Sequence, residues 1–384
     1  MNRPSCELSQ IIDRYGERFV LKHAPLQRQR NILQKLKECR TSVLGGHVDA
    51  CEGCGAIRVS YNSCRDRHCP KCQATNRERW IDARENDLLA ATYFHVVFTV
   101  PEALNPLFLC NPEILYNALF EAVKTTLETF AFDPKHLGAQ GGHIAVLHTW
   151  GQNIALHPHL HCIVPGGGIN PQGKWKHARN KGKYLFPVKA LSIVFRANFM
   201  RIVSKTRGIS FDDNLKKYLY HTPWVVYAKQ PFLGPKQVIE YLGRYSHKVA
   251  ISNHRLKCID GGEVSFSYKD YRHGGAQKEM KLPADEFLRR FCQHILPFRF
   301  VKIRHYGILA SRNKEKMREV QFSMGIVVFK KDKTPWQQIS REKLGFDPNV
   351  CPYCKGRMVT ISTFGQRAPP AFIAHVPTGG NYIS

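Results

Sequence analysis

Two pairs of closely spaced cysteines constrain the fold of this chain more than any other feature of its sequence. Cys51 and Cys54 form one Cys-x2-Cys pair, Cys69 and Cys72 form the next, and fourteen residues separate the pairs. Such spacing is typical of zinc ribbons, because two pairs bring four thiolates within reach of one tetrahedral ion. Zinc binding contributes roughly 10–16 kcal/mol of folding free energy in finger peptides. We therefore expect this segment to fold only around Zn²⁺.

Other candidate metal ligands stand near these pairs and near the C-terminus. Each of these two Cys-x2-Cys pairs would form a zinc knuckle. A second zinc site could be completed by residues around the knuckles: Cys39, His47, Cys64 and His68. A further Cys-x2-Cys pair, Cys351 and Cys354, has no obvious partner pair in the sequence. The chain contains thirteen cysteines, and their spacing indicates metal binding rather than the disulfides of a secreted protein.

The charge of the chain indicates a polyanionic partner. It has 57 Lys and Arg against 30 Asp and Glu, a net charge of +27 over 384 residues. Solubility alone needs only roughly 2–8 net charges in a small domain. Dense Lys and Arg favour nucleic acid, because phosphate contacts release counterions. Five such side chains stand around the second Cys-x2-Cys pair and are candidate nucleic-acid contacts: Arg65, Arg67, Lys71, Arg77 and Arg79.

Hydrophobic periodicity predicts an α+β chain. Apolar residues recur at helical spacing within residues 1–45 and again at 113–132 and 187–206. Alternation and turn residues predict strands at 93–100 and 143–150, and another strand follows in HLHCIVPGGG. Helices and strands do not alternate regularly, which excludes repeated βαβ units. The sequence shows neither an apolar run long enough to span a membrane nor a signal peptide, so we expect a soluble, intracellular protein.

The stretch HPHLHC, residues 157 to 162, predicts a strand with one imidazole face. Side chains alternate faces along a strand, so His159 and His161 point the same way. Imidazole is the commonest metal ligand in proteins, and two same-face histidines favour metal binding over a merely polar face. A third ligand must come from elsewhere. We prefer His148 on the preceding strand, with His157 and Gln152 as alternatives.

The stretch YLGRY provides a candidate nucleophile. Tyr241 and Tyr245 are four residues apart and share one face of a helix. A tyrosine hydroxyl titrates near 10, so it attacks well only when a nearby cation or metal lowers its pKa. Arg244 and Lys248 supply positive charge beside the pair. The alternative is that both rings pack into the core of an amphipathic helix.

Together these motifs resemble one known family. The stretches are HPHLHCIVPGGG, EYLGRYSHKVAISNHR, YKDYR, VKIRHYG and SCRDRHCPKCQ. They are similar to motifs of the two-tyrosine rolling-circle insertion-sequence transposases (the IS ninety-one type), whose nuclease belongs to the HUH superfamily. The similarity extends from about residue 10 to residue 355.

The resemblance implies a five-stranded antiparallel sheet flanked by helices. It implies that His159 and His161 bind Mg²⁺ or Mn²⁺, with His148 matching a third histidine of the related relaxases. Tyr241 and Tyr245 would attack one DNA strand, leaving a 5′-phosphotyrosine and a free 3′-OH, with Arg244 and Lys248 contacting the DNA. The expected segments are a helical and zinc-binding, DNA-binding domain (1–91), an HUH nuclease domain (92–310) and a C-terminal extension with a lone Cys-x2-Cys pair (311–384).

Two other interpretations stay open at this point. Residues 157 to 161 also fit the His-x-His-x-His pattern of histidine-triad nucleotide hydrolases, and the knuckles alone fit a non-enzymatic zinc-ribbon DNA-binding protein. The chain has no GxxxxGKS/T motif, so we expect a host helicase or the replication machinery to separate the strands. The expected partners are single-stranded element ends and target DNA. The expected location is the bacterial cytoplasm, in association with the nucleoid.

Overall fold

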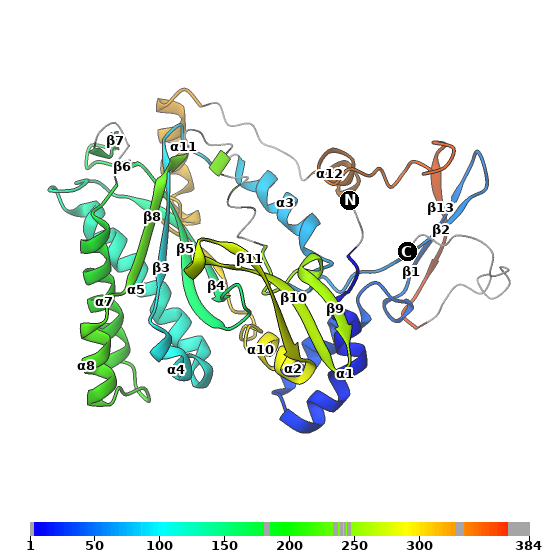
Figure 1. The fold of residues 1–384 in the computed structure, drawn as a ribbon. Helices are drawn as coiled ribbons and strands as arrows, with labels where there is room; N and C mark the ends of the chain where they lie inside the picture. The colour runs from blue at the N-terminus through cyan, green and yellow to red at the C-terminus, as the bar shows by residue number, and fades with distance from the viewer. Residues whose placement is uncertain are drawn as a thin grey trace.

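The computed structural model describes residues 4–85, 87–179, 185–232, 237–238, 241, 243, 247–326 and 334–367. Within them the chain forms the predicted α+β fold, with helices packed around antiparallel sheets (Figure 1). The strands form one five-stranded sheet, two three-stranded sheets and one two-stranded sheet. Among these residues no helix combines the length and the apolar character needed to cross a membrane.

The five-stranded sheet is the framework of the molecule. Its strands follow the order β12-β4-β5-β3-β8, and each neighbouring pair is antiparallel. The bounds are β3 Tyr93–Thr99, β4 Gly142–Trp150, β5 Leu156–Pro165, β8 Val225–Phe232 and β12 Ile303–Gly307. Alternating residues separate the two faces. Leu147 pairs with Leu160 on the apolar face, and His148 pairs with His159 on the other.

Four helices cover the apolar face of this sheet. Buried Leu119 and Phe195 of the helices belong to one core cluster with Phe98 and Leu160 of the strands. The helices stand together beside the sheet in Figure 1. Their bounds are α4 Asn105–Cys110, α5 Pro112–Phe132, α7 Val188–Ser204 and α8 Asp213–His221. The opposite face carries the histidines together with a second core cluster that includes Ile144 and Ile163.

The N-terminal helices pack on a sheet formed much later in the chain. Buried Ile11 shares one cluster with Phe266 and Phe287, and Arg18 forms an ion pair of 3.1 Å with Asp285. The N-terminal helices are therefore not packed as an isolated domain. This sheet has the order β11-β10-β9. The bounds are α1 Leu8–His23, α2 Gln27–Glu38, α10 Ala284–Cys292, β9 Leu256–Asp260, β10 Glu263–Asp270 and β11 Ala276–Pro283.

A small sheet joins the two ends of the described chain. Its order is β13-β1-β2, and it lies at the right of Figure 1. The predicted C-terminal extension therefore does not stand apart, since β13 pairs along the whole of β1. Two helices that contact each other, α3 and α12, also bring the two ends of the chain together. The bounds are β1 Gly46–Cys51, β2 Ile57–Tyr61, β13 Met358–Phe364, α3 Gln73–Glu85 and α12 Trp336–Lys343.

The remaining described elements are short connections. A two-stranded sheet pairs β6 with β7, and one further helix, α11, follows the last strand of the large sheet. Their bounds are β6 Gly167–Ile169, β7 Trp175–His177 and α11 Lys314–Ser323. Single 3-10 turns are η1 Ser42–Leu44, η2 Glu102–Leu104, η3 Asn253–Arg255, η4 Tyr271–His273 and η5 Ser311–Asn313.

Candidate metal centre

Three histidines converge on the face of the five-stranded sheet opposite the four helices. The β4–β5 register places His148 directly opposite His159, and His161 follows two residues later on the same face. One ring nitrogen from each of the three lies within 4.8 Å of the others. The Nε2 atoms of His159 and His161 are 3.1 Å apart. The structure therefore groups His148, and not the alternative His157, with the pair.

Hydrogen bonds orient two of these rings toward the cluster. The Nδ1 atom of His159 lies 2.7 Å from the carbonyl oxygen of His157. A carbonyl only accepts, so Nδ1 carries the proton and Nε2 is left with its lone pair. The Nδ1 atom of His161 lies 2.8 Å from Nε2 of His95. Contacts of this kind fix the tautomer of a metal-binding histidine.

Burial favours the neutral form of two of these imidazoles, His159 and His161. His148 and His161 are 2% and 9% exposed. Burial, followed by the charge of His157, lowers the pKa of His159 to about 3. Burial and the neighbouring histidines hold the pKa of His161 well below its usual value. A neutral imidazole is the form that binds metal, so the set fits a divalent ion with open coordination positions.

A fourth histidine links this cluster to a candidate nucleophile. His95 lies on β3, where it is 4% exposed. Its Nδ1 atom is 2.9 Å from the hydroxyl oxygen of Tyr241, and its Nε2 atom contacts His161. The sequence reasoning missed His95. The available signal was one histidine in the otherwise apolar strand YFHVVFT, with the same parity as Val97, which pairs with His161.

Of the other residues predicted to act beside Tyr241, the structure describes Lys248 alone. Tyr245 and Arg244 lie outside the described residues, so the predicted tyrosine pair stays a prediction for its second member. Lys248 is exposed, and its charge contributes to lowering the pKa of His159 and of His161. Positive charge therefore lies close to the histidine cluster.

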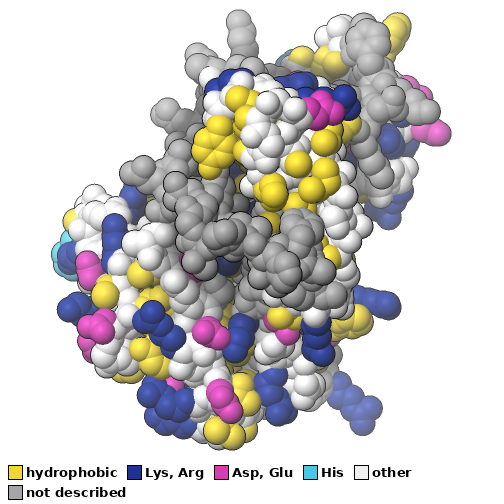
Figure 2. Space-filling view, turned by 90° about the vertical axis from the view of Figure 1, so that its right-hand side faces the viewer, with side chains coloured by type: hydrophobic (Ala, Val, Ile, Leu, Met, Phe, Trp, Pro, Cys, Tyr) yellow, Lys and Arg dark blue, Asp and Glu magenta, His cyan; other side chains and the backbone are white. Residues whose placement is uncertain are grey.

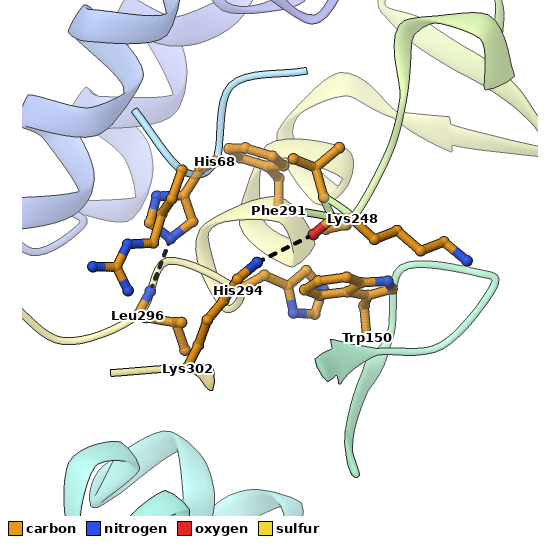
Figure 3. A pocket seen from close by; sticks show the side chains of 10 residues that line it. His68, Trp150, Lys248, Phe291, His294, Leu296 and Lys302 are labelled. Atoms are coloured by element: carbon orange, nitrogen blue, oxygen red, sulfur yellow. Dashed lines mark hydrogen bonds between the residues drawn. The ribbon is translucent and has the colours of Figure 1, made fainter. Parts of the chain in front are cut away.

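A small cavity marks the junction between the zinc-binding segment and the sheet. Its volume is about 20 Å³, room for a water molecule but not for a nucleotide. Figure 3 shows Lys302 reaching toward the Lys248 carbonyl oxygen, 3.5 Å from its Nζ atom, and His68 beside the Leu296 amide. Burial lowers the pKa of Lys302 to about 8. The cavity is therefore a packing gap where these segments meet, and it is too small to be a substrate pocket.

The cysteines form two clusters, and neither is the predicted set. One consists of Cys39, Cys64, Cys69 and Cys72. Its Sγ–Sγ distances are 3.5 Å from Cys39 to Cys72, 3.5 Å from Cys39 to Cys69, and 3.7 Å from Cys64 to Cys72. The other consists of Cys51, Cys54, Cys351 and Cys354. Sulfurs bound to one tetrahedral Zn²⁺ lie about 3.8 Å apart, given a Zn–S bond of roughly 2.3 Å. Both clusters therefore have the spacing of a four-cysteine zinc site.

The predicted sharing of one ion by the pairs at 51–54 and 69–72 is thus corrected. Pairing of β1 with β13 brings the C-terminal pair to the first knuckle, which leaves the second knuckle to Cys39 and Cys64. The suggested histidine ligands are engaged elsewhere. His68 contacts Asp66 Oδ1 at 2.8 Å, and His47 lies 3.6 Å from Asp49.

The predicted DNA-contacting side chains divide into two groups. Arg65 and Arg79 are exposed. The others have partners within the chain: Arg67 donates to the Phe300 carbonyl, Lys71 lies 2.6 Å from Glu7, and Arg77 lies 2.7 Å from Glu78. We therefore expect Arg65 and Arg79 to be more available to DNA than the three paired side chains.

Comparison with known proteins adds the family. A model described as "Transposase zinc-binding domain" matches residues 11–100, and one described as "Putative transposase" matches residues 142–316. The chain is 44% identical over 393 aligned residues to "Putative transposase y4qJ" of Sinorhizobium fredii (strain NBRC 101917 / NGR234), covering 96% of this chain and 98% of that protein. It is 28% identical over 340 residues to "Transposase for insertion sequence element IS801" of Pseudomonas savastanoi pv. phaseolicola, covering 85% and 81%. No solved structure matches.

The sequence similarity to the Sinorhizobium fredii protein extends over nearly the full length of both proteins, and it shows the class. This chain is a transposase, a DNA-processing enzyme whose partner is DNA. Within that class the chain belongs to the two-tyrosine insertion-sequence transposases of the IS91 type, with an N-terminal zinc-binding domain. This membership favours the transposase interpretation over the nucleotide hydrolase and over the non-enzymatic zinc-ribbon protein.

Proposed function

We propose that this transposase cleaves and rejoins single-stranded DNA by metal-assisted tyrosine transesterification, as rolling-circle transposition requires. The observation that carries the proposal is a continuous line of hydrogen bonds. It runs from the Tyr241 hydroxyl through His95 to His161, which is one of the three clustered histidines. These hydrogen bonds link the proposed nucleophile to the candidate metal centre.

The proposed step exchanges one phosphodiester for another. The Tyr241 oxygen forms a bond to phosphorus while the bond from phosphorus to the 3′ oxygen breaks. The phenolic proton is lost to solvent, and the departing 3′ oxygen takes up a proton to become a 3′-OH. The product is a 5′-phosphotyrosine, and attack by a 3′-OH on that link reverses the step and rejoins DNA. Because the step conserves the phosphodiester, it needs no external energy source.

The direction of the hydrogen bonds suits this chemistry. A histidine that presents Nε2 as a ligand keeps its proton on Nδ1. In His161 that proton is donated to Nε2 of His95. Neutral His95 then holds its own proton on Nδ1 and donates it to the Tyr241 oxygen. An accepted hydrogen bond stabilises the phenolate, so the tyrosine becomes a better nucleophile near neutral pH.

The metal ligands in this proposal are His148, His159 and His161, and the expected ion is Mg²⁺ or Mn²⁺. Such an ion would polarise the scissile phosphate and stabilise the charge that develops on its oxygens. Three imidazoles also bind Zn²⁺ or Ni²⁺ tightly. Assays should therefore begin with protein from which metal has been removed.

The remaining parts of the proposal concern DNA handling. Tyr245 would make the second covalent link, and the zinc-binding module would hold the element end through exposed side chains such as Arg65 and Arg79. Arg244 and Lys248 would contact the phosphates near the nucleophile. Strand separation would come from a host helicase or from replication, which places the protein with bacterial DNA.

The test is a cleavage assay on labelled single-stranded DNA carrying the element's own end, with Mg²⁺ or Mn²⁺. Wild type is compared with Tyr241→Phe, Tyr245→Phe and the double variant on a denaturing gel. The proposal requires a covalent protein–DNA adduct that disappears in the double variant and on adding a chelator. Metal-dependent cleavage without an adduct would instead identify water as the nucleophile.

A further inference from the structure

The cysteine cluster at the small sheet combines residues from opposite ends of the chain. Cys51 Sγ lies 3.4 Å from Cys354 Sγ, across 303 residues of sequence. Cys54 Sγ lies 3.7 Å from Cys351 Sγ, across 297 residues. The C-terminal pair falls outside both family matches, which cover residues 11–100 and 142–316. The cluster is therefore not accounted for by the zinc-binding domain alone.

The two cysteine pairs have the same backbone structure. In the first, the Cys51 amide donates to the Ala56 carbonyl at 2.9 Å, and in the second the Cys351 amide donates to the Gly356 carbonyl at 2.8 Å. The residue after each second cysteine, Gly55 or Lys355, adopts a left-handed conformation, with φ of +70° and +63°. Each amide of these two residues also donates to the carbonyl of the first cysteine of its pair, at 3.0 and 3.1 Å. Two like knuckles thus face one another.

The sulfur arrangement fits a metal better than it fits disulfides. All four Sγ atoms lie within 4.8 Å of one another. The closest cross-pair distances are near the roughly 3.8 Å edge of a tetrahedral Zn–S₄ site and well beyond the S–S bond of about 2.05 Å. The knuckles are also linked directly, because the Glu52 amide donates to the Arg357 carbonyl at 3.0 Å.

Apolar packing at this sheet is too small to hold it together unaided. Among the described residues of its three strands and the adjoining cysteine cluster, the buried apolar side chains besides the two buried cysteines are Val48 and Met358. Ile57 on β2 and Ile361 on β13 are 52% and 54% exposed. Figure 2 looks onto the side of the molecule where this sheet lies. In the upper part of that view, hydrophobic side chains are gathered at the surface. Small domains with so little core commonly depend on a structural metal.

We infer that Cys51, Cys54, Cys351 and Cys354 bind a second structural Zn²⁺, which fastens the C-terminal segment to the N-terminal zinc-binding module. Binding replaces four thiol protons by one ion and releases them to solvent. One polar contact supports the same junction: Thr360 Oγ1 donates to the buried Asp49 at 2.7 Å. The DNA-binding module is thereby built from both ends of the chain, and the C-terminal strand is part of it.

The first test counts zinc in purified full-length protein by elemental mass spectrometry. The comparison uses a His159→Ala/His161→Ala background, so that ions on the histidines do not contribute. Adding Cys351→Ser/Cys354→Ser should remove about one zinc per chain. The matched control, Cys110→Ser/Cys258→Ser, changes two exposed cysteines outside both clusters and should remove none. An unchanged zinc content in the Cys351/Cys354 variant would overturn the inference.

The second test needs no substitution and therefore does not depend on the variant folding. Native protein is treated with a maleimide, and labelled cysteines are mapped by peptide mass spectrometry. Cys54 and Cys354 are exposed, as are Cys110 and Cys258. Coordination should slow labelling of the first two by on the order of ten-fold relative to the second two, because the reactive thiolate is occupied. Adding a zinc chelator should abolish the difference. Equal rates before chelation would contradict the site.

Discussion

The histidine centre and the cysteine cluster of the small sheet both gather candidate metal ligands within 4.8 Å, yet the chain builds them in different ways. The three histidines come from two neighbouring strands of a sheet whose other face is covered by a large core. The four cysteines come from the two ends of the chain and rest on few buried side chains. The first site is organised by the fold, whereas the second helps to organise it. Losing ligands should therefore remove activity at one site and structure at the other.

The largest expected effect comes from His159→Ala combined with His161→Ala. Cleavage of single-stranded DNA should fall by about 10³-fold or more, because charge on the phosphate oxygens is no longer stabilised. The thermal unfolding midpoint should change little, since the sheet is held by its core. The measurement pairs cleavage rates with circular dichroism melting. If the His159→Ala/His161→Ala variant were unfolded at 25 °C, the histidines would be needed for folding, and the contrast with the cysteine cluster would be wrong.

The next effect concerns His95, which is a positioning residue because it acts through Tyr241 and His161. His95→Phe should slow cleavage by roughly 10²-fold and shift the rate–pH profile to higher pH, because the phenolate loses a donor. Metal binding should persist. The control is His157→Ala, which keeps the backbone carbonyl that accepts the hydrogen bond from His159, and its rate should stay near wild type. A uniformly lower rate with an unshifted pH profile would contradict positioning.

Acid should weaken the large sheet through buried histidines. Burial lowers the pKa of His143 to about 3, and its ring stacks on Tyr306 at 4.7 Å. Between pH 6.5 and 3 the unfolded chain binds a proton there that the folded chain does not, so stability falls as pH falls. Relative to His143→Phe, the wild type should lose about 1.4 kcal/mol per pH unit below 6. Urea unfolding at pH 7, 6 and 5 measures the free energy of unfolding of both proteins. The same pH dependence in wild type and variant would contradict the prediction.

The smallest expected effect is at the surface of the zinc-binding module. Arg79→Ala should weaken DNA binding a few-fold and reduce the salt dependence by roughly one counterion, because one phosphate contact is lost. Arg77→Ala is the matched control, since Arg77 is paired with Glu78 and should matter less. Fluorescence anisotropy at several salt concentrations gives both quantities. Equal effects of the two substitutions would remove the distinction between exposed and paired arginines.

The comparison also shows what the sequence could predict. The His159–His161 face and its partner His148 follow from strand parity and a short connection, both of which are local properties. His95 was missed because it lies 66 residues before His161 and contacts it only through sheet pairing. The cysteine sets were mispredicted for the same reason. Sequence spacing favours neighbouring pairs, whereas the pairing of β1 with β13 decides which sulfurs meet.

The most direct test of the central claim is the identity of the tyrosine that first becomes linked to DNA. Trypsin cleaves after Arg244, so Tyr241 and Tyr245 fall on different peptides. A single-turnover reaction with single-stranded element-end DNA and Mn²⁺ is quenched, digested with nuclease and trypsin, and examined by mass spectrometry. The account predicts a phosphonucleotide on the Tyr241 peptide, absent in His95→Phe at early times. An adduct on Tyr245 alone, or strand cleavage with neither peptide modified, would contradict it.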